Sequence, residues 1–267
     1  SRPEILSDHG FRSDGRKSTE LRSLNLELAS HTQADGSATV SHGLTSVLVT
    51  IHGPKEPRLR SSSVHDRATI NVSVDAPSFS GQSSLGNRRG RGDKRMLEFA
   101  ANIRSTFEPV IQTALYPRSN IDINVQVLQS DGSLLQTAIN ATTLALVDAG
   151  IAMTDLVCAI TCGLYDATPL LDLTSIEEAD IPHLTVGVLP RSGKASLVTL
   201  ETHVVVDRFM EMLRLTGEAA NAIHAEMTGV VLLRTDRLAS AMSSGGQPVV
   251  TGVSKVPMDV DYEMNER

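Results

Sequence analysis

Apolar and polar residues alternate along several stretches of the first 80 residues, as in strands that bury one face. The alternation is clear at 21–30, 44–53 and 68–76. Between the first two of these, Asp35-Gly36 is typical of a hairpin turn and leads into a further short strand. These four segments predict a meander of antiparallel strands.

A helical spacing replaces the alternation after Asp93, which is placed to cap the helix. Pro109 lies inside this pattern, so either the helix kinks there or a new turn starts with proline. A strand is expected at 121–129 and a helix at 134–150, with Gly150 at its C-terminus. The apolar positions that repeat every three to four residues are Met96, Ala100, Ile103, Phe107, Val110 and Leu115.

The second part of the chain repeats this order of elements. Strands are expected at 155–166, 168–174, 183–190 and 194–201, before a helix that opens near Asp207. The sequence therefore predicts an α+β fold with two strand-rich halves, 16–150 and 151–242, each followed by helices. Residues 1–15 are expected to form a polar arm, and 243–267 a disordered acidic tail.

Composition narrows the class of protein. The 267 residues include two cysteines and no Trp, and the formal net charge is −7, which argues against indiscriminate nucleic-acid binding. Cys158 and Cys162 lie in one apolar run and predict buried free thiols in a reducing compartment. We expect a soluble intracellular protein, because no apolar run has the length of a membrane span and the first residues are too polar for a signal peptide.

Two basic clusters stand out against the acidic background. Because Lys and Arg bind phosphates, the clusters favour a phosphate-rich partner, and the absence of interleaved aromatic residues predicts contacts to the backbone with little sequence selectivity. For either cluster alone, a solvated charged loop is the alternative. The residues are Lys55, Arg58 and Arg60 in the first, and Arg88, Arg89, Arg91, Lys94 and Arg95 in the second.

Two further features are candidates for chemistry. The turn at Asp131-Gly132 leads into a helix N-terminus, which favours anions, but no Arg or Lys in the turn completes a phosphate site. Glu177, Glu178 and Asp180 could hold a divalent cation or supply a general acid, although an ordinary acidic turn is the favoured interpretation. No P-loop, dinucleotide-binding glycine pattern or metal-ligand Cys/His spacing occurs.

Several long stretches, spread over residues 11–241, resemble the RNase PH family. Within that family the chain is most similar to the fungal type of exosome ring subunit that corresponds to the catalytic RNase PH-like subunit of the archaeal exosome. The stretches are "DGR" at 14–16 with "ELR" at 20–22, "ADGSATVSHGLTSVLVTIHGPKEPR" at 34–58, "LYPRSNIDINVQVLQSDG" at 115–132, "INATTLALVDAGI" at 139–151 and "GLYDATPLLDL" at 163–173.

The resemblance implies a six-membered ring of RNase PH-like subunits around an RNA channel. In active members of the family, phosphate attacks the 3′-terminal linkage of RNA and releases nucleoside diphosphates. An Arg pair and a Gly-Ser-Arg-Thr-like turn hold that phosphate. Here Lys94 and Arg95 match the Arg pair, but Leu135 is assigned to the position of the turn arginine. Asp180 matches the second family aspartate, whereas its partner aspartate is missing because the loop between Asp172 and Asp180 is shorter than in active members, and only a shift of register would let Glu177 or Glu178 replace it.

The expected function is therefore that of a non-catalytic ring subunit without a cofactor. It would assemble with other RNase PH-like subunits and cap subunits, and guide single-stranded RNA to a separate hydrolytic 3′→5′ nuclease for RNA processing and decay. The eight basic residues would line the RNA path, and the location would be the nucleus, including the nucleolus, and the cytoplasm. The alternative is an active phosphate-dependent 3′→5′ exoribonuclease that uses phosphate and Mg²⁺.

Overall fold

The structure is a computed structural model that describes residues 5–7, 9–56, 64–77, 80, 91–166, 168–200 and 202–243, without the side chains of 91–93 and 243. The chain divides into two units, Ser1–Leu232 and Leu233–Arg267, and the described part of the second is the end of one helix. The boundary expected near Gly150 falls inside the first unit. The expected tail lies outside the described residues, except for the backbone of Ser243.

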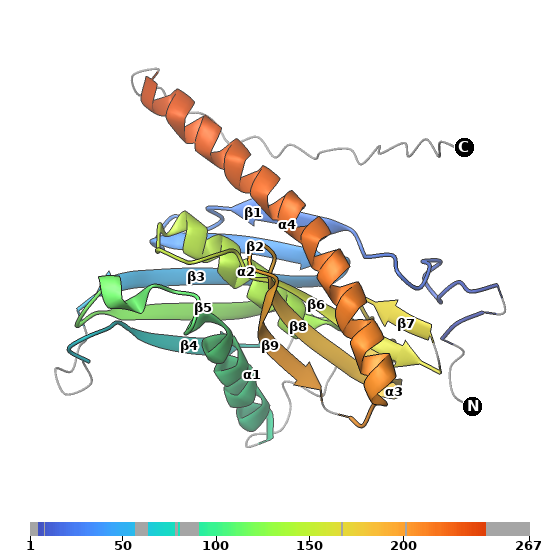
Figure 1. Ribbon diagram of the computed structural model, residues 1–267. Helices are drawn as coiled ribbons and strands as arrows, with labels where there is room; N and C mark the ends of the chain where they lie inside the picture. The colour runs from blue at the N-terminus through green and yellow to red at the C-terminus, as the bar shows by residue number, and fades with distance from the viewer. Residues whose placement is uncertain are drawn as a thin grey trace. The chain divides into compact units, whose positions relative to one another are not determined.

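The first sheet has five strands in the order β1-β2-β3-β5-β4 (Figure 1). Strands β1 to β3 form the expected antiparallel meander, but the prediction is wrong for β4, which pairs in parallel with β5 instead of following β3. The reason is the long crossover between β4 and β5, which contains a helix and so returns the chain in the same direction. The bounds are β1 (Leu24–Leu28), β2 (Gly36–His42), β3 (Thr45–Lys55), β4 (Thr69–Asp75) and β5 (Asn120–Gln129).

The crossover helix α1 (Arg91–Phe107) begins two residues before Asp93 and ends two residues before Pro109. The helix does not kink at the proline, because it has already ended, and a short 3₁₀ helix η2 (Thr113–Leu115) follows. The side chain of Asp93 lies outside the described residues, so its predicted capping role stays a prediction.

The second sheet contains the four strands expected from the pattern, in the antiparallel order β7-β6-β8-β9. The expected α+β class is thereby confirmed. Between β7 and β8 the chain forms a short helix that the pattern did not predict, since six residues are too few to show a helical period. The bounds are β6 (Cys158–Tyr165), β7 (Thr168–Leu171), α3 (Ser175–Asp180), β8 (His183–Leu189), β9 (Lys194–Leu200) and α4 (Val206–Ser243).

Helix α2 (Leu134–Asp148) packs against both sheets, which is why it is buried almost all round (Figure 1). Gly150, with φ of +69°, follows its C-terminus as expected. Two amide side chains attach the helix to strand β6: Asn140 exchanges hydrogen bonds with the backbone of Ala159 at 2.8 and 3.1 Å, and Gln136 accepts one from the Thr161 N–H at 2.8 Å. The two sheets therefore share one core, with α2 at its centre.

The two cysteines are free and buried, as predicted. Burial raises the pKa of each thiol to about 12, so neither is a reactive thiolate at neutral pH. Cys158 Sγ lies 3.8 Å from Met227 Sδ of α4 and thus belongs to the packing of that helix on the second sheet. Within the described residues, no helix has both the length and the apolar character needed to cross a membrane.

Candidate functional site at the start of helix α2

The turn between β5 and α2 is held tightly in place. Gly132 has φ of +78°, and a Cβ there would lie 2.4 Å from the carbonyl carbon of Thr174, so only glycine fits without a shift of backbone. Ser133 Oγ donates to Leu173 O at 3.0 Å, and Ser175 Oγ donates to Asp131 Oδ1 at 2.8 Å. The start of α2 is therefore fixed to the segment that leads into α3.

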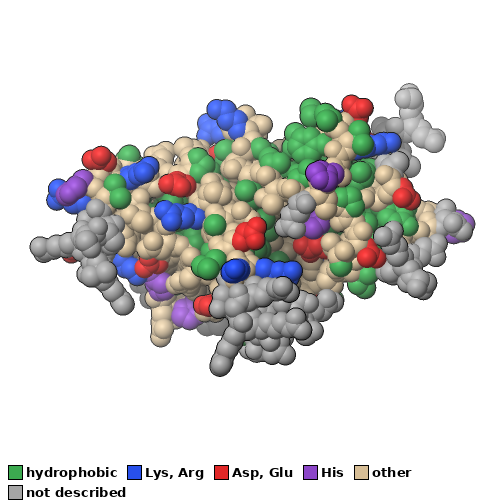
Figure 2. Space-filling model, turned by 90° about the horizontal axis from the view of Figure 1, so that it is seen from below, with side chains coloured by type: hydrophobic (Ala, Val, Ile, Leu, Met, Phe, Trp, Pro, Cys, Tyr) green, Lys and Arg blue, Asp and Glu red, His purple; other side chains and the backbone are tan. Residues whose placement is uncertain are grey.

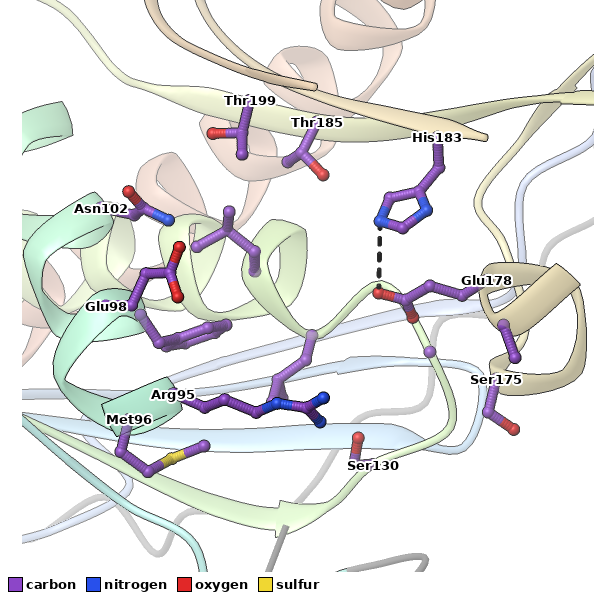
Figure 3. A pocket seen from close by; sticks show the side chains of 15 residues that line it. Arg95, Met96, Glu98, Asn102, Ser130, Ser175, Glu178, His183, Thr185 and Thr199 are labelled. Carbon is purple, nitrogen blue, oxygen red and sulfur yellow. Dashed lines mark ion pairs between the residues drawn. The ribbon is translucent and has the colours of Figure 1, made fainter. Parts of the chain in front are cut away.

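A cavity of about 630 Å³ opens beside this turn, between α1, α3 and the strands β8 and β9 (Figure 3). Backbone N–H groups in the first turn of a helix have no acceptor inside the helix, so the N-terminus of α2 gives this wall a partial positive charge. The wall is formed by Arg95, Met96, Glu98, Phe99, Asn102, Ser130, Gly132, Leu134, Leu135, Ser175, Glu178, Ala179, His183, Thr185 and Thr199.

Arg95 is the one Arg or Lys among the described residues on this wall. Its side chain extends from α1 towards Ser130, and the figure shows no ion pair from it to the other residues drawn (Figure 3). Lys94, its neighbour in the predicted basic pair, is exposed and does not line the cavity. The structure thus brings one member of that pair to the cavity.

Glu178, a residue of α3, places its carboxylate at the N-terminus of α2. One of its carboxylate oxygens, Oε2, accepts a hydrogen bond from the Ser133 N–H at 2.9 Å, and the other, Oε1, lies 3.9 Å from His183 Nε2 (Figure 3). A carboxylate at a helix N-terminus is favourable both to the dipole and to the unpaired N–H groups. His183, to which the sequence assigned no role, is therefore part of the cavity wall.

The other two acidic candidates do not face the cavity. Asp180, the last residue of α3, is exposed and absent from the wall. Glu177 is buried: its Oε2 accepts the Thr174 N–H at 2.9 Å and lies 3.7 Å from Arg12 Nη1. In the described part of the chain, no group of three or more His, Cys, Asp or Glu side chains could hold a metal ion.

Two leucines stand where a phosphate-binding turn would need an arginine. Counted from Gly132 and Ser133, the third position of a Gly-Ser-Arg-Thr-like turn is Leu134, one residue before the Leu135 assigned to it above. Both leucines line the cavity, so the shift of register does not bring a cation to the turn. A Leu side chain cannot donate the charged hydrogen bonds that an arginine offers to phosphate.

The remaining basic residues are placed only in part. Lys55, at the end of β3, forms an ion pair with Asp122, with Nζ 2.7 Å from Oδ2. Burial alone would raise the pKa of Asp122, but hydrogen bonds from Lys55 and Asn71 lower it. The backbone of Arg91 starts α1, whereas its side chain and all of Arg58, Arg60, Arg88 and Arg89 lie outside the described residues. On the face shown in Figure 2, the described Lys and Arg side chains are scattered and form no continuous patch.

A buried ionic centre lies behind the turn and was not predicted from the sequence. Asp172, with a fully buried side chain, accepts two hydrogen bonds from the Arg22 guanidinium, at 2.7 Å and 3.0 Å, and a third from the Arg22 N–H at 2.9 Å. Arg12 donates to Leu171 O at 2.6 Å, Ser18 O at 2.9 Å and Asp172 O at 3.2 Å.

This centre fixes the N-terminal segment to the fold. Arg22 also donates to Asp131 O at 2.8 Å, which extends the network to the turn before α2. Ile5 and Arg12 are buried, so the segment expected to form a polar arm is anchored to the fold where it is described. The sequence signal that could have pointed to this centre was the pair of motifs at 14–16 and 20–22, which contain Arg16 and Arg22. The motifs contributed to the resemblance to the family, but they did not reveal a role for either arginine.

Comparisons with known proteins agree with this architecture. Family models described as the 3′ exoribonuclease family, RNase PH, match residues 20–152 with domain 1 and residues 155–219 with domain 2. The exosome complex component RRP41 of Mus musculus is 41% identical over 230 residues, which cover 85% of this chain and 93% of that protein. The chain belongs to the RNase PH family.

Relatives from fungi and solved structures extend the similarity. The exosome complex component SKI6 of Saccharomyces cerevisiae is 39% identical over 84% of this chain and 91% of its own. The crystal structure of rice (Oryza sativa) Rrp46 superposes with a TM-score of 0.73 at 25% identity, covering 83% of this chain and 100% of that one. The Archaeoglobus fulgidus exosome with RNA bound to the active site has a TM-score of 0.70 at 20% identity, over 82% and 93% of the two chains, and shows the shared fold.

Proposed function

We propose that this chain is a non-catalytic ring subunit of an RNA exosome. It assembles with other RNase PH-like chains and with cap subunits, and it guides single-stranded RNA to a separate hydrolytic 3′→5′ nuclease. The relatives named above as exosome components support the assembly part of the proposal, because the chain matches them over nearly their whole length.

The observation that carries the non-catalytic part is the composition of the wall at the start of α2. Leu134 and Leu135 occupy the turn, and Arg95 is the one Arg or Lys on the described wall. Phosphorolysis needs a phosphate ion held as a nucleophile, and such an ion requires several charged or backbone donors that converge on one point. Here the Ser133 N–H already donates to Glu178.

An enzyme assay separates this proposal from the alternative of an active phosphorolytic exoribonuclease. The full chain, assembled with its ring partners, is incubated with 3′-tailed RNA, phosphate and Mg²⁺, and nucleoside diphosphates are measured. We expect the ring to release no more nucleoside diphosphate than a ring in which Arg95 is replaced by Gln. Nucleoside diphosphate release that depends on this chain would contradict the proposal and favour the alternative.

The proposed RNA path consists of backbone contacts from the two basic clusters. Of Arg95 and Lys55, two of the described residues of these clusters, Arg95 is the stronger candidate, because no ion pair is drawn from it in Figure 3, whereas Lys55 is paired with Asp122. The proposed RNA path needs no cofactor.

The proposed location is the nucleus, including the nucleolus, and the cytoplasm. Fluorescence microscopy of the tagged chain tests it, and exclusion from either compartment would contradict it.

A further inference from the structure

The N-terminal segment covers part of one edge of the second sheet. We call its described residues, 5–7 and 9–18, the N-terminal strap. Strand β7 lies at the edge of the sheet, and its Leu171 N–H donates to Ser18 O of the strap at 2.9 Å (Figure 1). The edge of a sheet exposes backbone groups that need partners, and the strap supplies one of them.

Two arginines of the strap bind the segment that leads from β7 into α3. The Arg12 guanidinium donates to Leu171 O at 2.6 Å and to Asp172 O at 3.2 Å. Arg16 Nη1 donates to the same Asp172 oxygen at 3.1 Å. Arg12 Nη1 also lies 3.7 Å from Glu177 Oε2, which belongs to α3 itself. The strap is therefore joined to both β7 and α3.

Side chains of the strap, of β7 and of the residues around α3 form a small hydrophobic core. In it, Ile5 of the strap packs with Leu170, Leu173 and Ile181. None of these four residues belongs to the main core, which surrounds α2 and contains residues of both sheets. Because the two cores are separate, the small one can lose its contacts while the main one stays packed.

Helix α3 connects the small core with the cavity beside α2. The helix has six residues, too few to be stable without packing. On the cavity side, side-chain hydrogen bonds join α3 to the turn before α2, and each such bond contributes little alone. The same side supplies Ser175, Glu178 and Ala179 to the cavity wall. The position of this wall therefore depends on the small core and on the strap.

We propose that the N-terminal strap is a latch for the cavity. The strap and α3 open and close as one cooperative unit, while the main core stays folded. When the strap is in place, α3 forms a wall of the cavity, and when the strap is released, that wall is lost. The latch goes beyond the proposed function and stands whether or not the assembled ring is catalytic.

Amide hydrogen exchange of the full chain, followed by mass spectrometry of peptides, tests the latch. Ile5→Ala removes a strap side chain from the small core. Ile151→Ala is the matched control, because Ile151 is equally buried, with 4% of its surface exposed, but belongs to the main core. We expect Ile5→Ala to speed exchange of 9–18 and 168–181 at least about tenfold, and that of 120–129 in β5 less than about twofold.

The control should show the reverse pattern. Ile151→Ala should speed exchange of 120–129, which opens with the main core, and leave 168–181 within about twofold of wild type. Equal acceleration of all peptides in Ile5→Ala would mean that the strap opens only when the whole chain unfolds, and would overturn the inference. Acceleration of 9–18 without 168–181 would overturn it too, because α3 would then keep its place without the strap. Nucleoside diphosphate release, which tests the proposed function, is unaffected by either result.

A second measurement covers the case in which Ile5→Ala does not fold, as checked by circular dichroism. In the wild-type chain, the most protected amides of 9–18 and 168–181 should have protection factors within about threefold of each other. Both should be at least about tenfold less protected than those of 120–129, because they open without the main core. Equal protection in all three peptides would overturn the inference.

Discussion

The segment from Leu171 to Asp180, which includes α3, carries buried carboxylates on one side and a carboxylate that faces a cavity on the other. On the inner side, Asp172 and Glu177 are buried and meet arginines of the N-terminal segment. On the outer side, Glu178 faces an open cavity whose one described Arg or Lys is Arg95. The arginines of the N-terminal segment thus hold the fold together, whereas the turn beside the cavity carries leucines.

The difference shows which interactions this chain depends on. Buried charges are costly unless each has a partner. The loss of one partner on the inner side should therefore lower the free energy of unfolding, rather than change the affinity for a ligand. On the outer side the side chains are solvated, and a substitution should change ligand affinity with little effect on stability. The predictions below test this contrast.

The largest effect is expected at the inner side, from Asp172→Asn. The substitution keeps the shape of the side chain but leaves the Arg22 guanidinium, 2.7 Å away, without its buried counter-charge. We expect a loss of about 3–5 kcal/mol in the free energy of unfolding, measured with urea and circular dichroism.

Asp14→Asn is the matched control for this substitution. Asp14 also accepts a hydrogen bond from an arginine, Arg16 Nε at 2.6 Å, but in an exposed position. Its loss should cost less than about 1 kcal/mol. Equal losses in the two variants would contradict the contrast between the buried centre and solvated pairs.

The second effect is a loss of stability in acid caused by His42. Complete burial lowers the pKa of His42 to about 4, from 6.5, although the charge of Asp172 opposes the shift. Because the unfolded chain binds the proton first, stability should fall as the pH drops from 6.5 towards 4, by up to about 3 kcal/mol.

The pH dependence can be assigned with a variant. Urea midpoints measured across this range should be nearly flat in His42→Gln, which cannot titrate, once its own lower stability is subtracted. Asp172 contributes in a lower range: hydrogen bonds from Arg22 lower its pKa against the effect of burial, so its stabilisation is lost only below pH 3.8. A wild-type profile without slope between pH 6.5 and 4 would contradict the role of His42.

The third effect concerns the turn that joins the two sides. Gly132→Ala adds a Cβ 2.4 Å from the backbone of Thr174 and forces alanine to a φ of +78°. We expect a loss of at least about 2 kcal/mol in the free energy of unfolding. Gly150→Ala is the control: its φ is +69° but nothing lies within 4 Å, so about 1 kcal/mol is expected. Similar losses would mean that the close approach to Thr174 does not matter.

Most of the strands could be predicted from the sequence, because a half-buried strand leaves a period of two in its side chains. The residues of a strand do not show in the same way which other strand will pair with it. The alternation of Ile70, Val72 and Val74 identified β4, but its parallel pairing with β5 depends on the crossover and not on the residues of β4 itself. The same limit explains why the meander was predicted one strand too long.

The candidate site could be located but not resolved into roles. The turn at Asp131-Gly132 before an apolar helix was a sufficient signal for the start of α2. The acidic run at 177–180 was visible too, yet only helix α3 decides that Glu177 is buried, Glu178 faces the cavity and Asp180 is exposed. Arg12 was missed because a single arginine in an irregular segment has no period.

The smallest effect is expected on the outer side, from charge neutralisation along the proposed RNA path. Arg95→Gln should lower the affinity of the assembled ring for single-stranded RNA about threefold to fivefold, and reduce the slope of log K against log salt by about 0.7 for the lost phosphate contact. Lys55→Gln should do less, because Asp122, 2.7 Å away, already compensates the lysine charge. Fluorescence anisotropy over a salt series measures both, with urea stability unchanged in Arg95→Gln. An unaltered slope in Arg95→Gln would remove Arg95 from the RNA path, and a larger effect of Lys55→Gln would mean that Lys55, and not Arg95, carries the contact.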